Sequence, residues 1–562
     1  MLFSCSIFTC RFLNFLLLTL FVVSLFFAVF CAVHQRPWVM FYQDFAVFIA
    51  LVSGCLLCLI FGRINFVIPK FCFFIITLVP IPILQFLFGK VFYFGDALLA
   101  SAYLVGACLS LIAGASLYNR FGLSFVICLS YVFVFFGVIS CFVAILQWLH
   151  LDAGPWVTDR PEGTRVFANF AQPNNFSTFL GFSFVSLLIL KRYTPIGRLL
   201  FSVLLAFILF ILAVTQSRTA WMFSFVVVVF YSFYLLRKNY IHDFKFLIFW
   251  FCFFWFCVLV LPYINEILLL SGSENLERLK HAGRLGIWFQ IVSGLMQEPL
   301  FGYGWNQVSV AQVAGALSFD HMEFVEHSHN IVLDILVWNG LLVGGCIIVF
   351  LVCFFLIVFK KLDSDLSYLL LLMLGLFVTH AMLEFPHDYA LFLFPSCLII
   401  GVLLTEQRWG VITFSRKMML SVLVLVTMLG FQVAREYVFL QNEFQTMRYR
   451  QAGIVNAEPP RKLDHIVLLT NLKSFLIFAQ TEAEPNMDDE ELEMMRKVSL
   501  RYAYPPAMFR YILALGLNGR TDEARDHLAR LNGIYSDSIS SEAVDNIRTL
   551  SNKYPELSKI IE

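Results

Sequence analysis

The sequence predicts an all-α polytopic integral membrane protein, and its composition, its apolar runs and the distribution of its basic residues support this class. Of the 562 residues, 60% are hydrophobic and only 14% are charged. Soluble domains carry about 25% charged residues, so this deficit indicates that much of the surface faces hydrocarbon. The net charge of +1 gives no overall field that would favour nucleic acid as a partner.

Apolar runs of roughly 18 residues or more recur between Phe12 and Ala434. Each is long enough to cross a hydrocarbon layer of about 30 Å, so we expect about 13 transmembrane helices. The expected spans are 12–33, 43–61, 71–88, 95–118, 123–148, 175–190, 198–215, 219–236, 245–262, 330–359, 366–383, 389–404 and 417–434. No small-residue cleavage site follows the first run, which favours a retained first span over a cleaved signal peptide.

Every second connection between these spans is short and basic. The residues concerned are Arg63, Lys70, Arg120, Lys191, Arg192, Arg198, Arg237, Lys238, Lys245, Lys360, Lys361, Arg408, Arg416 and Lys417. The positive-inside rule places these connections in the cytoplasm. The opposite set then faces the periplasm: 34–42, 89–94, 149–174, 215–219, 263–329 and 384–388. An odd number of crossings puts the two termini on opposite sides, and since the connection 34–42 is periplasmic, the N-terminus is cytoplasmic and the C-terminus periplasmic.

Two domains follow from this pattern. Residues 1–435 form the transmembrane domain, with large periplasmic loops at about 149–174 and 263–329, and residues 436–562 form a small C-terminal periplasmic helical domain. Its two amphipathic patterns flank Gly519 and resemble one tetratricopeptide (TPR-like) unit, too short for a solenoid. Thr521 is placed to cap the second helix. We expect a helical cap or docking domain.

The first polar cluster on the periplasmic side is RPEGTRVFANFAQPNNFSTF at 160–179. Gln172 and Asn174 flank Pro173, which favours the start of a helix, and the free backbone N–H groups of a helix start suit an anion. An ordinary polar cap on a transmembrane helix explains the same residues.

The second cluster is AVTQSRTAWMF, in which Arg218 stands between two apolar spans. A guanidinium at the membrane edge is costly without a partner or a purpose. It can extend to lipid headgroups, but the positive-inside bias disfavours a lone arginine on this side and favours a grip on a substrate anion.

The third cluster is HAGRLGIWFQIVSGLMQEPLFGYGWNQ at 281–307. Ile287, Ile291 and Leu295 recur at helical spacing, and Trp288 is an aromatic typical of membrane interfaces. Arg284 lies one turn before Trp288, at the depth of a lipid-linked phosphate. Binding of Arg284 to an ordinary lipid phosphate is the alternative.

The fourth cluster, DHMEFVEHSHNIVLDILVWNG, places Asp320, His321, His327, His329 and Asn330 just before a span. Histidine titrates near pH 6.5, so His329 can take a proton from a hydroxyl at neutral pH. A metal site is an alternative, although zinc needs three or four convergent ligands and the HSH spacing supplies a loose pair. A capping histidine is another, and suits His327 better than His329.

Together these motifs resemble the bacterial membrane O-oligosaccharyltransferases, the pilin or protein glycosylation ligases within the O-antigen ligase and Wzy polymerase superfamily. The resemblance covers nearly the whole chain. It rests on QPNN at 172–175, QSRTAW at 216–221, GRLGIW at 283–288 with PLFGYGWNQ at 299–307, EHSHN at 326–330, LEFPHDY at 383–389 and the tail with ALGLNGRTDEA at 514–524. One departure is Trp338, where similar sequences often carry an acidic residue.

The resemblance implies en bloc transfer of an oligosaccharide from undecaprenyl pyrophosphate to Ser or Thr of a pilin or other periplasmic protein, at the bacterial inner membrane. It implies no cofactor, metal or nucleotide sugar. His329 would be the catalytic general base. Arg218, Arg284 and Arg165 would stabilise the pyrophosphate, and Gln172, Asn174 and Asn330 would complete the substrate-binding set. Membrane lipids and an acceptor protein docked by the C-terminal domain are the expected partners.

Four other functions compete with this hypothesis. An O-antigen ligase would use the same donor with lipid A core as the acceptor, and a heteropolymer polymerase would extend a glycan. The tail favours a protein acceptor over both. A membrane transporter would place ionisable groups near the bilayer midplane, whereas these candidates lie in loops and at span ends. A structural scaffold explains the spans but not the cationic set.

Overall fold

The computed structural model describes residues 2–60, 66–152, 154–161, 163–238, 240, 243–270, 284–319, 323–454, 459 and 461–562. Arg63, Asp320 and His321, named above, lie outside these residues. The chain divides into two compact units. Unit 1 holds Met1–Ile76, Tyr103–Arg278 and Phe354–Gly430, and unit 2 holds Thr77–Ala102, Leu279–Cys353 and Phe431–Glu562.

The described residues are mainly helical. The helices are α1 (Leu2–Phe30), α2 (Phe41–Ile60), α3 (Phe71–Leu78), α4 (Pro80–Leu87), α5 (Phe94–Phe121), α6 (Leu123–Trp148), α7 (Pro173–Tyr193), α8 (Arg198–Val214), α9 (Arg218–Lys238), α10 (Asp243–Ile267), α11 (Arg284–Leu295), α12 (Val308–Ala314), α13 (Ile331–Asn339), α14 (Gly345–Lys360), α15 (Asp365–Ala381), α16 (Ala390–Glu406), α17 (Arg416–Gln451), α18 (Thr470–Gln480), α19 (Asp489–Arg501), α20 (Pro505–Leu517), α21 (Thr521–Ile534), α22 (Asp537–Ser551) and α23 (Ser558–Ile561).

Within the described part of the chain, nine helices are long and apolar enough to cross a membrane. Shorter apolar helices occupy four further expected spans, at Phe71–Leu87, Arg198–Val214, Asp365–Ala381 and Ala390–Glu406. The prediction of a multi-pass helical membrane protein is confirmed, while the number of crossings stays a prediction. α17 is longer than expected, because it continues past residue 434 to Gln451.

Unit 1 also contains two strands that the sequence analysis did not predict. β1 (Phe66–Pro69) pairs antiparallel with β2 (Val411–Phe414), with Phe66 opposite Phe414. Both segments contain valine and isoleucine, which favour strands, and their pairing satisfies backbone groups that the short connections would otherwise leave free. The pairing brings together two connections that the basic residues assign to the same side.

Other connections of unit 1 also meet as the topology requires. The His34 imidazole donates from Nε2 to the Asn169 carbonyl at 3.2 Å, and the Arg165 guanidinium donates to the Gln216 carbonyl at 3.2 Å. These contacts join connections 34–42, 149–174 and 215–219, all expected on the periplasmic side. The grouping agrees with the predicted topology, and the direction of the chain across the membrane stays a prediction.

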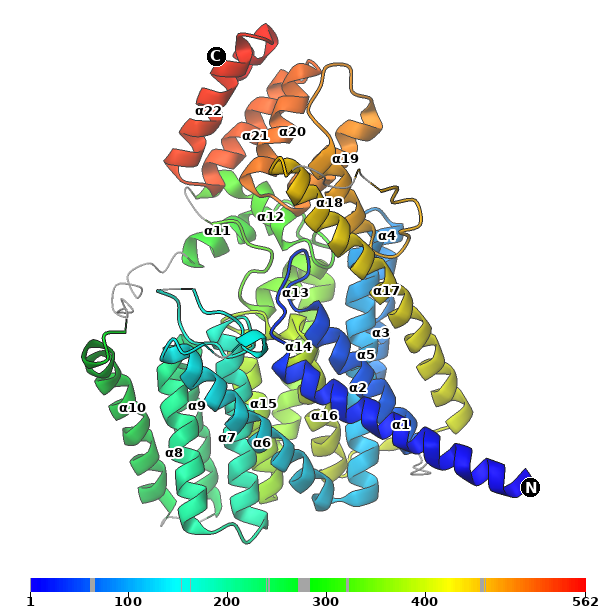
Figure 1. The fold of residues 1–562 in the computed structure, drawn as a ribbon, viewed down its shortest axis with the longest axis vertical. Helices are drawn as coiled ribbons and strands as arrows, with labels where there is room; N and C mark the ends of the chain where they lie inside the picture. Colours follow the sequence, from blue (N-terminus) through cyan, green and yellow to red (C-terminus); the bar gives the residue numbers. More distant parts are fainter. Residues whose placement is uncertain are drawn as a thin grey trace. The chain divides into compact units, whose positions relative to one another are not determined.

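α7, α8, α9 and α15 lie side by side in unit 1 (Figure 1). A second close contact joins α5 and α16, where glycines let two backbones approach. A Cβ at Gly114 would lie 2.1 Å from the Leu398 carbonyl oxygen, and one at Gly401 would lie 2.1 Å from that of Leu111. Small residues at helix contacts are typical of membrane proteins, since apolar side chains gain little by leaving lipid.

We predict that Gly401→Ala lowers the thermal unfolding midpoint of the detergent-solubilised protein, at a cost of about 1–3 kcal/mol, because α5 and α16 must separate. Gly375→Ala is the matched control: it lies in α15, and its added Cβ meets nothing within 4 Å. Equal midpoints for the two variants would contradict the close α5–α16 contact.

In unit 2 the C-terminal helices share one hydrophobic core with the segments that precede them. Tyr93, Val313 and Ala316 are buried among Met495 and Leu531 of the C-terminal helices. In Figure 1 α12 lies beside α21. Residues 89–94 and 299–316 therefore form part of the same folded body as the tail.

The expected helices on either side of Gly519 are present as α20 and α21, and Gly519 has a φ of +77°. The capping prediction for Thr521 is wrong. Thr521 is the first residue of α21, and Arg520 before it makes no side-chain cap hydrogen bond. Arg520 instead pairs with Glu523, with Nε 2.7 Å from Oε1.

Candidate functional site

The structure divides the seven predicted site residues between the two units. Arg165, Gln172, Asn174 and Arg218 belong to unit 1. Arg284, His329 and Asn330 belong to unit 2.

The unit 1 group gathers around Ser217. Gln172 is the N-cap residue of α7 and Pro173 its first residue, as predicted. The buried Asn174 accepts a hydrogen bond of 2.6 Å from the Ser217 hydroxyl and donates one of 3.1 Å to Glu384. Asn174 therefore ties the start of α7 to Ser217 and to the 384–388 connection.

Two arginines, Arg218 and Arg165, lie close to the contact between Asn174 and Ser217. Arg218 follows Ser217, is the first residue of α9 and is exposed. Arg165 binds the carbonyl of Gln216, which has a φ of +49°. The structure thus brings the segments of Arg165, Asn174 and Arg218 together at the starts of α7 and α9, where helix N-termini favour an anion.

His329 occupies a tight turn just before α13. Its φ is +57°, in the left-handed region that few non-glycine residues adopt. The Ser328 hydroxyl donates to the Asn330 carbonyl at 2.9 Å, and the Ser328 N–H donates to the Asp334 carboxylate at 2.8 Å. These bonds on both sides of His329 hold its backbone in this conformation.

α11 lies against the same turn. The Trp288 indole N–H donates to the Ser328 carbonyl at 2.7 Å. Arg284, the first residue of α11, lies one turn before Trp288 on the helix. The contact places the start of α11 next to the turn that carries His329, which agrees with the grouping expected from the sequence.

Asn330 has a structural role that the sequence analysis did not assign. It is the N-cap residue of α13, and its side-chain oxygen accepts from the N–H groups of Val332 (3.0 Å) and Leu333 (3.2 Å). Asn330 therefore fixes the helix that follows His329. Its assignment to substrate binding stays a prediction.

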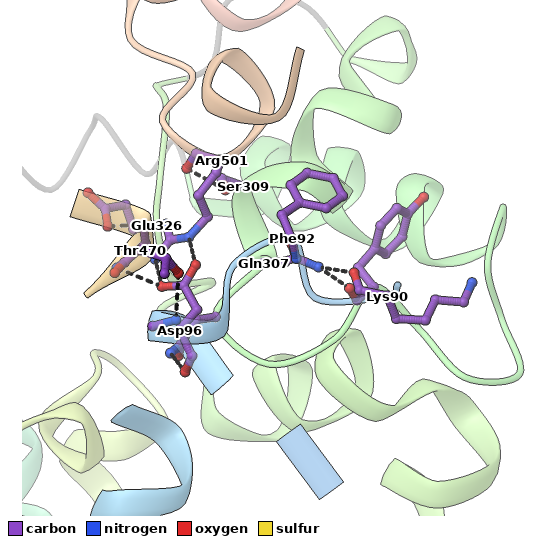
Figure 2. A network of polar contacts seen from close by, with 12 residues as sticks. Lys90, Phe92, Asp96, Gln307, Ser309, Glu326, Thr470 and Arg501 are labelled. Atoms are coloured by element: carbon purple, nitrogen blue, oxygen red, sulfur yellow. Dashed lines mark hydrogen bonds and ion pairs between the residues drawn. The ribbon is translucent and has the colours of Figure 1, made fainter. Parts of the chain in front are cut away.

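Figure 2 shows a buried polar network in unit 2 that sequence reasoning missed. The Arg501 guanidinium lies 3.2 Å from the Asp96 carboxylate and 3.5 Å from that of Glu326. The Tyr504 hydroxyl donates to Glu326 at 2.9 Å. Glu326 is three residues before His329, so the network connects the start of α5 and the C-terminal helices to the His329 turn.

The electrostatics of this network depend on Arg501. Burial alone would lower the pKa of its guanidinium, but the carboxylates of Asp96 and Glu326 help to raise that pKa above its ordinary value. Asp96 could have been noticed in the sequence, because it is an acidic residue at the start of an apolar run. Arg501 gave no such signal, because it stands in an ordinary amphipathic helix.

The departure from the family pattern at Trp338 also has a structural explanation. Trp338 is 4% exposed, and its ring stacks on that of Trp305 with centroids 4.7 Å apart. The Trp305 indole N–H donates to the side-chain oxygen of Asn339 at 3.0 Å. Trp338 is therefore a core residue of unit 2, and the partly buried Trp305 packs against that core.

Comparison with known proteins gives matches along most of the chain. A family model described as O-Antigen ligase matches residues 201–348, and one described as Virulence factor membrane-bound polymerase, C-terminal, matches residues 368–546. The chain is 28% identical over 549 residues to a General O-oligosaccharyltransferase of Acinetobacter baylyi (strain ATCC 33305 / BD413 / ADP1), covering 93% of each chain. No solved structure gives a match.

A ComP-specific O-oligosaccharyltransferase of the same strain is 26% identical over 344 residues, covering 60% of this chain and 62% of the relative. Together with the helical architecture, these matches indicate a membrane glycosyltransferase that is similar to the O-antigen ligases. More particularly, both relatives are O-oligosaccharyltransferases, the family that the motifs of the sequence resemble, and the chain is similar to one of them over 93% of its length.

We predict that Arg501→Met destabilises the protein by about 3–5 kcal/mol, because it leaves the Asp96 carboxylate, 2% exposed, buried without its cation. Arg548→Met is the control, since the Arg548–Asp545 pair is 65% and 71% exposed and such pairs contribute about 1 kcal/mol or less. Thermal unfolding in detergent measures both. A midpoint for Arg501→Met as high as that of Arg548→Met would refute the structural importance of the network.

Proposed function

We propose that the protein carries out O-linked protein glycosylation, transferring an oligosaccharide as one block from undecaprenyl pyrophosphate to Ser or Thr of a periplasmic protein such as a pilin. The similarity to a general O-oligosaccharyltransferase over 93% of both chains is the observation that carries this proposal. The contact between α11 and the His329 turn supports the residue roles. We place the protein in the inner membrane with its active site on the periplasmic side.

In the proposed reaction the acceptor hydroxyl oxygen attacks the anomeric carbon of the first sugar. His329 takes the hydroxyl proton as the new C–O bond forms. The bond from the anomeric carbon to the pyrophosphate oxygen breaks, and its electron pair leaves on undecaprenyl pyrophosphate. Direct attack inverts the anomeric centre and needs no covalent enzyme intermediate.

The geometry of the His329 turn suits a general base. A base must keep its ring within hydrogen-bond reach of the acceptor hydroxyl, and a backbone held on both sides limits the positions of that ring. Left-handed conformations are costly for ordinary residues and cluster at functional sites. In the His329 turn, the hydrogen bonds of Ser328, Asp334 and the N-cap Asn330 offset this cost.

Arg284, Arg218 and Arg165 would stabilise the pyrophosphate. Charge grows on this group as the anomeric bond breaks, and guanidinium groups fixed in advance stabilise such charge without reorganisation. Gln172 and Asn174 would orient the donor. The Asn174 amide already bonds to Ser217 and Glu384, so we expect it to act mainly by positioning the start of α7.

The acceptor is proposed to be a protein, although an O-antigen ligase acting on lipid A core is a second candidate. The match to the O-antigen ligase model, at 201–348, favours the second candidate. The C-terminal helices favour a protein acceptor, because they share a core with the segment before His329 and lie within the region aligned with a protein-glycosylating relative.

We predict that His329→Asn lowers the transfer rate by at least about 100-fold while leaving donor affinity within about twofold, because general-base catalysis contributes about 10²–10⁴-fold. Asparagine tolerates the left-handed backbone and so preserves the turn. Transfer is measured by mass spectrometry of periplasmic proteins and with purified enzyme, and donor affinity by binding of the lipid-linked oligosaccharide.

The control for this variant is His150→Asn, at a left-handed histidine (φ +51°) in the 149–174 connection. Wild-type transfer by His329→Asn at matched expression would refute the base assignment. Transfer by the wild type to lipid A core alone would support the second candidate function.

We predict that Arg284→Ala and Arg218→Ala each weaken donor binding and transfer together, by about tenfold or more, because each removes a charge-assisted contact with the pyrophosphate. Arg120→Ala, in a connection expected on the cytoplasmic side, is the control. Donor affinity measured with the lipid-linked oligosaccharide decides the outcome. An unchanged affinity in both variants would contradict the pyrophosphate assignment.

A further inference from the structure

Unit 2 contains a groove of about 560 Å³. Its walls come from five segments: the connection 89–92, the loop 297–303, helix α12, and the C-terminal helices α19 and α21. The volume falls in the range of about 300–1,000 Å³ that is typical of binding pockets. None of the residues assigned to the transfer reaction lines it.

Part of the lining of the groove is apolar. Phe92, Tyr303, Val310, Val313 and Leu500 line it. Val310 and Val313 are 7% and 1% exposed, so they form the floor. Burial also raises the pKa of the Tyr303 phenol to about 12, and this hydroxyl donates to the Gly294 carbonyl at 2.9 Å.

Most of the charged groups of the lining are paired with one another. Lys90 lies 2.8 Å from Glu298, and Arg530 lies 2.6 Å from Asp526. Arg496 is likewise paired with Glu493, outside the lining. Burial lowers the pKa of His527 to about 4, so its imidazole is neutral near pH 7.

This anatomy fits a polypeptide better than a charged or sugar ligand. A small anionic ligand or a sugar is bound by polar groups that converge on it. The cations of this groove are instead paired with neighbouring carboxylates. Protein interfaces combine an apolar centre with a polar rim, and an apolar or aromatic anchor side chain seated in a pocket supplies much of their affinity.

We infer that this groove is a docking site for the acceptor polypeptide, which seats an apolar side chain between Phe92, Val310 and Leu500. The inference rests on the proposed function and deepens it, because it assigns the acceptor a binding site away from the hydroxyl that is modified. Recognition at the groove raises the local concentration of that hydroxyl at the transfer site.

The groove and the His329 segment are joined through helix α12. Val310 and Val313 face the groove, while Gln312 between them donates to the Glu323 carbonyl at 2.9 Å and accepts from the Val325 N–H at 3.0 Å. Leu500 in the groove precedes Arg501, which pairs with Glu326. Docking therefore takes place on elements that also hold the His329 turn.

The test uses Ala314→Trp, which places a large side chain in the groove, and Leu500→Ala, which removes apolar surface without adding bulk. Ala529→Trp is the matched control, because Ala529 is an exposed residue of α21 outside the lining. Two acceptors are compared: the intact protein that the wild type glycosylates, and a synthetic peptide of about 12 residues around its modified Ser or Thr.

We predict that Ala314→Trp raises the KM for the intact acceptor about tenfold more than the KM for the peptide, and that Leu500→Ala raises the same ratio about threefold. Ala529→Trp should leave the ratio at its wild-type value. An unchanged ratio in both groove variants, an equal rise in the control, or a change confined to the donor KM would overturn the inference. A wild-type enzyme that glycosylates no protein would instead refute the proposed function.

Discussion

The organisation of unit 2 depends on one buried guanidinium. Arg501 contacts Asp96, which is 405 positions away in the sequence, and Glu326, which is 175 away. Removing these charges from water is costly, and their mutual attraction compensates only when the geometry is maintained. Three distant segments are therefore fixed relative to one another: the start of α5, the segment before His329 and the end of α19.

Much of the membrane fold could be predicted because hydrocarbon imposes a simple rule. A span must be apolar for about 20 residues and must satisfy its own backbone, so each helix leaves a local signature. Each expected span corresponds to an apolar helix, including short ones such as α8. The β1–β2 pair could not be predicted, because it joins segments about 345 residues apart through backbone hydrogen bonds that leave no periodic pattern. The extension of α17 was missed because its helix continues after its apolar surface has ended.

In the candidate site, too, features that depend on neighbouring residues could be predicted, whereas contacts between distant residues could not. Pro173 marked the start of α7, and the motif at 326–330 marked the His329 turn, because both signals lie within a few residues. The partners of these residues could not be predicted. Glu384 holds Asn174 across 210 positions, and Trp288 reaches Ser328 across 40. Pairings of this kind depend on how the helices pack, which a single sequence does not specify.

The C-terminal helices consequently have two roles. The first is structural: Arg501 and Tyr504 hold Glu326, Gln290 of α11 donates to the Gly533 carbonyl at 2.9 Å, and the tail completes the core beneath α12. The second is recognition, at the groove formed between those helices and α12. A binding site built on rigid elements is more precise than one built on mobile loops. Placing acceptor recognition on the helices that also position the His329 turn makes the two geometries interdependent, so sequence changes that retune recognition must preserve the Asp96–Arg501–Glu326 contacts.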